Sequence, residues 1–173
     1  MALDRADIHK LLELLNAELQ TDEVTGELYL VGGAVMCIVY NARNSTRDLN
    51  AFFRPVLSIR AAAGRVAAGN DISEFWLNDA VKGFLSENGD YQPFLELSNL
   101  KVMTASPEYL LAMKCLAMRL GAEFHDEADI RYLLRFLNVA NYQEALDIIS
   151  SYYPLDQFPQ KTLYALEEIL GDK

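Results

Sequence analysis

Positive charge is scarce in this 173-residue chain, which has 15 lysines and arginines against 25 aspartates and glutamates. Proteins that bind DNA in general displace counterions with lysine and arginine, so a formal net charge of −10 argues against general DNA binding. Cysteine is scarce too. Cys37 and Cys115 are too few for a disulfide framework or a zinc motif, and their apolar helical surroundings are typical of a buried core.

Long hydrophobic runs are also lacking. No uninterrupted apolar stretch approaches the roughly 20 residues that cross a bilayer. The first residues, Met1 to Arg5, lack the apolar segment of a signal peptide. We therefore expect a cytoplasmic protein that does not interact with membranes.

The first half of the chain predicts a strand, a helix and a second strand after an N-terminal helix. Apolar residues at helical spacing predict the first helix over residues 4–20, and a short apolar run predicts a strand over residues 27–31 that ends at Gly32-Gly33. A helix follows over residues 34–40. Alternating polar and apolar residues then predict a strand over residues 48–53.

The remaining pattern predicts a helix around residues 59–67, a short helical stretch beginning at 76–81, and a hairpin formed by residues 94–97 and 100–104 at a sheet edge. Ser106-Pro107-Glu108 is a helix start, and further helices begin near His125, near Asn141 and after Pro159. The expected fold class is α+β: a small mixed sheet with flanking helices over residues 1–105, followed by a C-terminal helical bundle over residues 106–173 that packs on this core.

Gly32 and Gly33 join the first predicted strand to a helix. A ligand can approach the backbone closely at such a turn, and the unpaired N–H groups of a helix start favour phosphate oxygens. The alternative is that the glycines only make a tight turn. Two residues apart on the next strand, Asp48 and Asn50 share a face and can converge beside the turn. Two such oxygen ligands suit Mg²⁺, although polar residues at a strand end can also serve only to contact solvent.

The segment around Asp48 is locally basic within an acidic chain. Between residues 43 and 65 it contains five arginines and Asp48 as its single acid, so an anionic ligand would be drawn there. For Arg60 and Arg65 we expect only a role in solvating a helix face.

These residues resemble a known family. Leu30-Val31-Gly32-Gly33, followed by Arg43, Thr46, Asp48 and Asn50, resembles the nucleotidyltransferase signature of a strand, Gly-Gly or Gly-Ser, a helix and then Asp-x-Asp. The chain is most similar to bacterial minimal nucleotidyltransferases of the abortive-infection toxin type and their uncharacterised relatives. The resemblance covers residues 27–135. Its later part rests on Trp76-Leu77-Asn78, Leu100-Lys101-Val102, Ser106-Pro107-Glu108, Lys114, Ala117, Arg119, Asp126, Asp129 and Ile130.

The resemblance implies that the chain transfers a nucleoside monophosphate from a nucleoside triphosphate to an RNA or protein acceptor. It also implies a Mg²⁺ or Mn²⁺ cofactor held by the Asp-x-Asp pair, and a toxin–antitoxin or phage-defence setting with a cognate antitoxin or other partner protein. The implied nucleotide-binding residues are Gly32, Gly33, Arg43, Thr46, Arg47 and Lys114. Asp48, Asn50, Lys114 and Asp129 form the implied catalytic set.

One departure from the family pattern leaves two functions open. Asn50 stands at the second Asp position and brings an amide oxygen without negative charge. The alternative to an active enzyme is therefore a degenerate module of the same fold that binds a nucleotide or a protein partner. Glu96 is the candidate third carboxylate, or equally the solvent face of an edge strand.

Lys114 is the single charge in an apolar helical run, so it must reach the surface or find an anion. The sequence alone favours the surface. The resemblance instead favours contact with a triphosphate, near an aspartate matched by Asp126 or Asp129. Those two residues can also serve as an acidic first turn of a helix.

Overall fold

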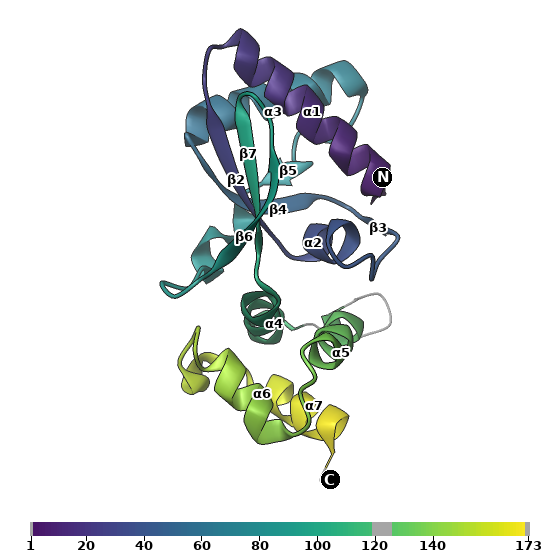
Figure 1. The fold of residues 1–173 in the computed structure, drawn as a ribbon, viewed down its shortest axis with the longest axis vertical. Coiled ribbons are helices and arrows are strands. Elements are labelled where there is room, and N and C mark those ends of the chain that lie inside the picture. The colour runs from purple at the N-terminus through teal and green to yellow at the C-terminus, as the bar shows by residue number, and fades with distance from the viewer. Residues whose placement is uncertain (1, 119–125, 172–173) are drawn as a thin grey trace. The chain divides into compact units, whose positions relative to one another are not determined.

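The computed structural model describes residues 2–118 and 126–171 and has a mixed α/β architecture (Figure 1). Within the described residues it contains seven α-helices, a five-stranded sheet and a two-stranded sheet. The chain forms two compact units. Unit 1 comprises residues 1–83 and 91–105, and unit 2 comprises residues 84–90 and 106–173. The division at residues 105 and 106 coincides with the predicted domain boundary, whereas residues 84–90 lie with the helical unit.

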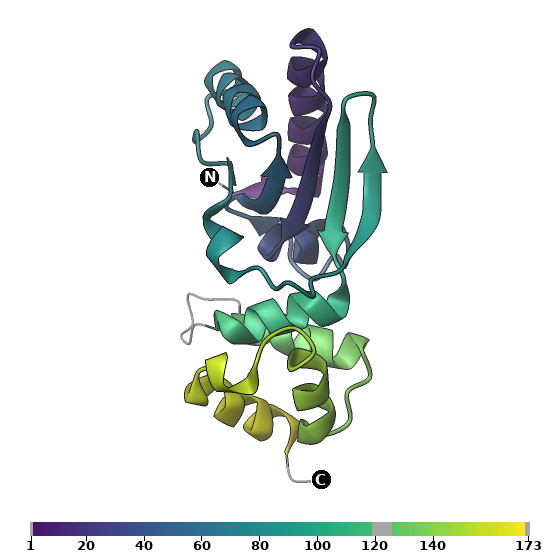
Figure 2. The ribbon, with the colours of Figure 1, turned by 90° about the vertical axis from the view of Figure 1, so that its left-hand side faces the viewer.

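The sheet of unit 1 is mixed, as expected, and its strand order is β5-β4-β2-β7-β6. Its two antiparallel pairs are β2 with β4 and β6 with β7, and its two parallel pairs are β2 with β7 and β4 with β5. The strands are β2 (Gly26–Val31), β4 (Leu49–Arg54), β5 (Leu77–Asn78), β6 (Tyr91–Glu96) and β7 (Leu100–Ala105). The predicted hairpin is confirmed as β6 and β7, with β6 at the sheet edge (Figure 2).

One face of this sheet carries the core of unit 1. Alternation along β2 and β4 buries Leu28, Leu30, Leu49 and Ala51, whose side chains share that face. The helices α1 (Arg5–Thr21) and α3 (Val56–Asn70) bury their apolar stripes in this core. A Cβ built on Gly26 would lie 2.9 Å from Ile59 of α3 and 3.1 Å from Leu19 of α1, so both helices approach the start of β2.

The predicted first helix is confirmed, because α1 begins and ends within one residue of the predicted range. Asp4 caps it: its side chain accepts from the Asp7 backbone N–H at 2.8 Å, and the Asp7 side chain accepts from the Asp4 backbone N–H at 3.0 Å. The helix after the glycine turn is α2 (Gly33–Ile38). It starts one residue earlier and ends two residues sooner than predicted.

The helical stretch predicted from Trp76 is wrong at its start. Leu77 and Asn78 form β5, and a 3₁₀ helix follows only at η1 (Ala80–Phe84). Trp76 explains the difference, because its indole is buried and donates to the Ala63 carbonyl at 3.0 Å, while its own carbonyl accepts from the Leu49 N–H at 2.6 Å. These long-range bonds hold the segment extended against β4, where a helix would leave the first N–H of β4 without this acceptor.

Unit 2 contains four helices among the described residues: α4 (Pro107–Leu116), α5 (Asp126–Phe136), α6 (Tyr142–Ile149) and α7 (Gln160–Leu170), with η2 (Leu155–Gln157) between the last two. The predicted cap at Ser106 and the predicted helix start near Asn141 are confirmed, and the side chains of both residues accept from backbone N–H groups of α4 and α6. The predicted start near His125 lies outside the described residues, as does Arg119.

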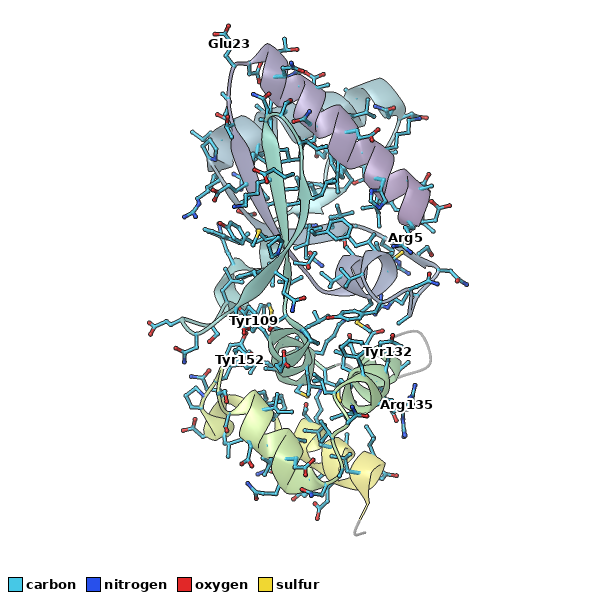
Figure 3. The ribbon with its side chains drawn as sticks, in the orientation of Figure 1. Arg5, Glu23, Tyr109, Tyr132, Arg135 and Tyr152 are labelled. Carbon is cyan, nitrogen blue, oxygen red and sulfur yellow. The ribbon has the colours of Figure 1, made fainter. Side chains whose placement is uncertain are left out.

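Tyrosines of unit 2 hold the segment of residues 84–90 against the helices. Tyr109 and Tyr152 stack with ring centroids 5.1 Å apart (Figure 3), and the Tyr109 hydroxyl accepts from the Ser86 N–H at 2.9 Å. Gly89 lies directly on the buried Tyr109 ring, because a Cβ built there would be 2.6 Å from Cε2. The tight packing of this segment explains why it belongs to unit 2.

Cys37 and Cys115 are both buried free thiols, which confirms their assignment to the core. Burial raises the pKa of both thiols. Among the described residues, no helix combines the length and apolar character needed to cross a membrane.

Candidate functional site

The glycine turn at the end of β2 has a backbone conformation that requires glycine at one position. Gly32 has φ 73° and ψ −149°, a region that residues with a side chain rarely adopt. Its carbonyl accepts from the N–H groups of Val35 and Met36 at 3.2 and 3.4 Å, which starts α2. The turn therefore leaves the first N–H groups of α2 without helical partners.

Two predicted binding residues lie directly over this turn. A Cβ built on Gly33 would be 2.6 Å from Arg43 Nη1 and 3.0 Å from Thr46 Oγ1. Thr46 is held there by a small sheet in which β1 (Leu3–Asp4) pairs with β3 (Ser45–Thr46), with Leu3 opposite Thr46. The absence of a side chain at residue 33 is what allows a cation and a hydroxyl to approach the backbone together.

Asp48 and Asn50 lie beside the turn at the start of β4, and both are half-buried. They alternate with the buried Leu49, so they share a face as predicted. Asn50 is opposite Val31, and its Nδ2 would be 3.6 Å from a Cβ built on Gly32. The strand pairing thus brings the Asp48 segment to the glycine turn.

A third polar side chain completes this end of the sheet. Asn78 of β5 is aligned with Asn50 of β4, and its Nδ2 donates to Asp48 Oδ2 at 3.3 Å. Asn78 is among the residues that carry the family resemblance, but the sequence predicted no role for it. A strand of two residues carries no periodic signal, so the sequence offered no means of placing Asn78 beside Asp48.

The oxygen donors at this end of β4 fit one magnesium ion. Asp48 offers a carboxylate and Asn50 an amide oxygen, and Mg²⁺ in proteins commonly takes one or two carboxylates together with phosphate oxygens and water. A second ion would need further carboxylates. Across residues 2–118 and 126–171, no group of three or more His, Cys, Asp or Glu side chains is arranged to hold a metal ion.

Three of the arginines in the basic segment have acidic partners. Arg54 pairs with Glu27 at 2.8 Å, Arg60 with Asp79 at 3.0 Å, and Arg65 with both Glu18 and Asp22 at 2.9 and 2.5 Å. Arg60 and Arg65 are exposed on α3, as expected for a solvated helix face, and each also pairs with at least one acidic side chain. Their acidic partners compensate these three charges, whereas Arg43 is the arginine that lies over the glycine turn and Arg47 is exposed near it in sequence.

Glu96 does not lie with the other predicted metal ligands, so the assignment of Glu96 as third carboxylate is wrong. Glu96 is exposed on β6 and lies opposite Lys101 of β7, which in turn lies opposite Glu27 of β2. Asn50 of β4 lies opposite Val31 of β2. The four-residue offset between Glu27 and Val31 is about 13 Å along the strand. Three strand spacings add about 14 Å across the sheet. Glu96 is thus the solvent-facing residue of an edge strand.

Lys114 finds anions within unit 2. Its ammonium lies 2.8 Å from Asp129 Oδ2 and 3.6 Å from Asp126 Oδ1, and only 10% of its side chain is exposed. The surface position favoured by the sequence alone is therefore wrong. Burying these charges is tolerable because they are paired with one another. A contact between Lys114 and a triphosphate stays a prediction.

No family model, curated protein or solved structure matches this chain in comparisons with known proteins.

Proposed function

We propose that this chain is a nucleotidyltransferase that moves a nucleoside monophosphate from a nucleoside triphosphate to an RNA or protein acceptor. The observation that carries the proposal is the convergence of three separate segments at one end of the sheet. The glycine turn, the loop containing Arg43 and Thr46, and the start of β4 at Asp48 bring phosphate-binding and metal-binding groups together.

Each of these groups has a part in binding the triphosphate. Gly33 lets phosphate oxygens approach the backbone N–H groups at the start of α2. Arg43 supplies positive charge, and a guanidinium can donate two parallel hydrogen bonds to a phosphate. Thr46 supplies a hydroxyl that now donates to the Asp48 carbonyl at 3.2 Å. Asp48 and Asn50 would hold Mg²⁺ or Mn²⁺, and the bound ion would neutralise part of the phosphate charge.

In the proposed reaction an acceptor oxygen forms a bond to the α-phosphorus while the bond from the α-phosphorus to the bridging oxygen breaks. Pyrophosphate leaves, and the acceptor proton passes to solvent or to a base. Such reactions depend on positioning and on electrostatic stabilisation of the phosphoryl charge. The resemblance also assigns Lys114 and Asp129 to the catalytic set and points to a toxin–antitoxin or phage-defence component with a cognate antitoxin. A nucleoside triphosphate as substrate is consistent with a reaction in the cytoplasm.

Transfer can be tested directly. The full chain is incubated with each α-labelled ribonucleoside triphosphate, Mg²⁺ or Mn²⁺, and either total RNA or a protein extract. Label should move to one acceptor class, and Asp48→Ala should abolish that transfer because it removes the carboxylate of the site. Asp156→Ala, at an exposed position in η2, is the matched control and should transfer normally. Equal labelling by the Asp48→Ala variant would exclude the proposed site.

A second candidate function is a catalytically degenerate module of the same fold that binds a nucleotide or a protein partner without transfer. The neighbours of Asp48 favour it: Asn50 and Asn78 are carboxamides, and Glu96 is at the other end of the sheet. Two-metal transfer relies on carboxylates that hold both ions, and one carboxylate suits nucleotide binding better. Nucleotide binding that depends on Asp48, without detectable transfer to RNA or protein, would select this second candidate.

A further inference from the structure

Asn78 lies where its side chain can fix the orientation of the Asp48 carboxylate. It is the last residue of β5, the strand at the opposite sheet edge from β6. The parallel pairing with β4 aligns it with Asn50. Its Nδ2 donates to Asp48 Oδ2 at 3.3 Å. The half-buried setting limits competition from water for this bond.

The orientation of the Asn78 amide is fixed by its other partners. Its Oδ1 accepts from the Ala80 N–H at 3.2 Å, and its Nδ2 donates to the Phe75 carbonyl at 3.1 Å. Rotating the amide by 180° would place its oxygen against a carbonyl and a carboxylate, and its NH₂ group against an N–H. All three contacts would become repulsive. Asn78 must therefore present an N–H to Asp48.

We propose that Asn78 is a positioning residue that orients the Asp48 carboxylate for the metal-bound triphosphate. This inference rests on the proposed function. A donor fixed to Oδ2 restrains rotation of the carboxylate, so its ligand geometry is set before the ligand arrives. An amide does this without adding charge. A carboxylate at residue 78 would instead repel Asp48 and attract cations.

The coupling between the two side chains is tested by thermal unfolding of the full chain without nucleotide. Asn78→Asp should lower the Tm, because it places two carboxylates in contact. The loss should be clearly smaller in an Asp48→Asn background, where one charge is gone. Added Mn²⁺ should raise the Tm of the Asn78→Asp variant more than that of the wild type, because paired carboxylates bind a divalent cation.

The positioning role is tested by calorimetric titration with Mn²⁺ and each ribonucleoside triphosphate. Asn78→Ala should weaken binding about tenfold, the lower end of the effect of removing a partner that orients a metal ligand. Ser73→Ala is the matched control. It removes the bond from the Phe75 N–H to Ser73 Oγ, at 3.1 Å, in the same loop without touching Asp48, and it should bind as tightly as wild type.

The outcomes separate this inference from the proposed function. Wild-type binding with an equally tight Asn78→Ala variant would overturn the positioning role and leave the proposed function standing. If Asn78→Asp lowered the Tm equally in the wild-type and the Asp48→Asn backgrounds, the two side chains would not be coupled, and the positioning role would be overturned as well. A wild-type chain that binds none of the triphosphates would overturn the proposed function and, with it, the positioning role.

Discussion

Replacing Lys114 by methionine is the sharpest test of the buried charges in unit 2. Lys114 lies between Asp129 and Asp126, whose side chains are only 3% and 6% exposed. Methionine keeps most of the aliphatic stem and removes the ammonium. Both aspartates then lose a cation at 2.8 and 3.6 Å while staying buried. The variant should therefore be less stable than the wild type.

The expected loss is large for a single substitution. Removing one partner of a buried ion pair typically costs about 3–5 kcal/mol, because the remaining charge stays desolvated. At about 2–4 °C per kcal/mol for a chain of this length, a loss of 3 kcal/mol lowers the Tm by about 6–12 °C. Had Lys114 reached the surface, the same substitution would change the stability by less than about 0.5 kcal/mol.

Circular dichroism during heating and during urea unfolding measures the loss. Lys82→Met is the matched control, because Lys82 is 68% exposed and lies 3.7 Å from Asp79. It should unfold within about 0.5 kcal/mol of the wild type. Adding Asp129→Asn to Lys114→Met should recover part of the stability, since it removes one of the two buried negative charges that Lys114 pairs with in the wild type. A Lys114→Met variant that melts with the wild type would refute the buried ion pair.

Other predictions concern the metal site, the packing of unit 2 and its response to pH. Asn50→Asp adds a negative charge and should raise Mg²⁺-dependent triphosphate affinity on the order of tenfold in calorimetry, and unchanged affinity would show that charge at residue 50 is not limiting. Gly89→Ala should cost about 1–3 kcal/mol in urea unfolding, because its Cβ would meet the buried Tyr109 ring at 2.6 Å. Gly64→Ala, within α3 and with nothing within 4 Å of its Cβ, should be neutral or stabilising by up to about 1 kcal/mol. Burial raises the pKa of Tyr152 from 10.0 to about 12. The contribution of the neutral Tyr152 hydroxyl to the free energy of unfolding is complete below pH 10 and is lost as the pH rises toward 12. In urea unfolding at successive pH values, Tyr152→Phe should therefore lose less stability than the wild type between pH 10 and 12.

The sequence was sufficient to predict those features of the structure that depend only on neighbouring residues. Ser106 followed by Pro107 predicted the start of α4, and Asn141 predicted that of α6, because a capping side chain bonds to N–H groups two or three residues away. The helical spacing of α1 and the alternation of β4 showed which side chains are buried. The glycine turn was evident because Gly32 and Gly33 follow directly on an apolar strand.

The site could be predicted from the sequence only in part. Asp48 and Asn50 share a face because they are two apart on one strand, and this local geometry was correct. Glu96 was placed wrongly because its distance from Asp48 depends on strand order and register across three strand pairings. A single-strand pattern shows which face a residue takes, but the pairing decides which end of the sheet it reaches.

By itself, then, the sequence determined the helix starts, the buried faces and the glycine turn beside Asp48, because each depends on contacts within a few residues. The tertiary structure decided the partners of the charged and polar side chains. It paired Lys114 with Asp129 across a helix boundary and brought Asn78 to Asp48 through β5, whose two residues form a strand only because Trp76 is anchored to α3 and β4. Such contacts join residues 13 to 30 positions apart, so local propensity does not encode them and only the packed chain can select them.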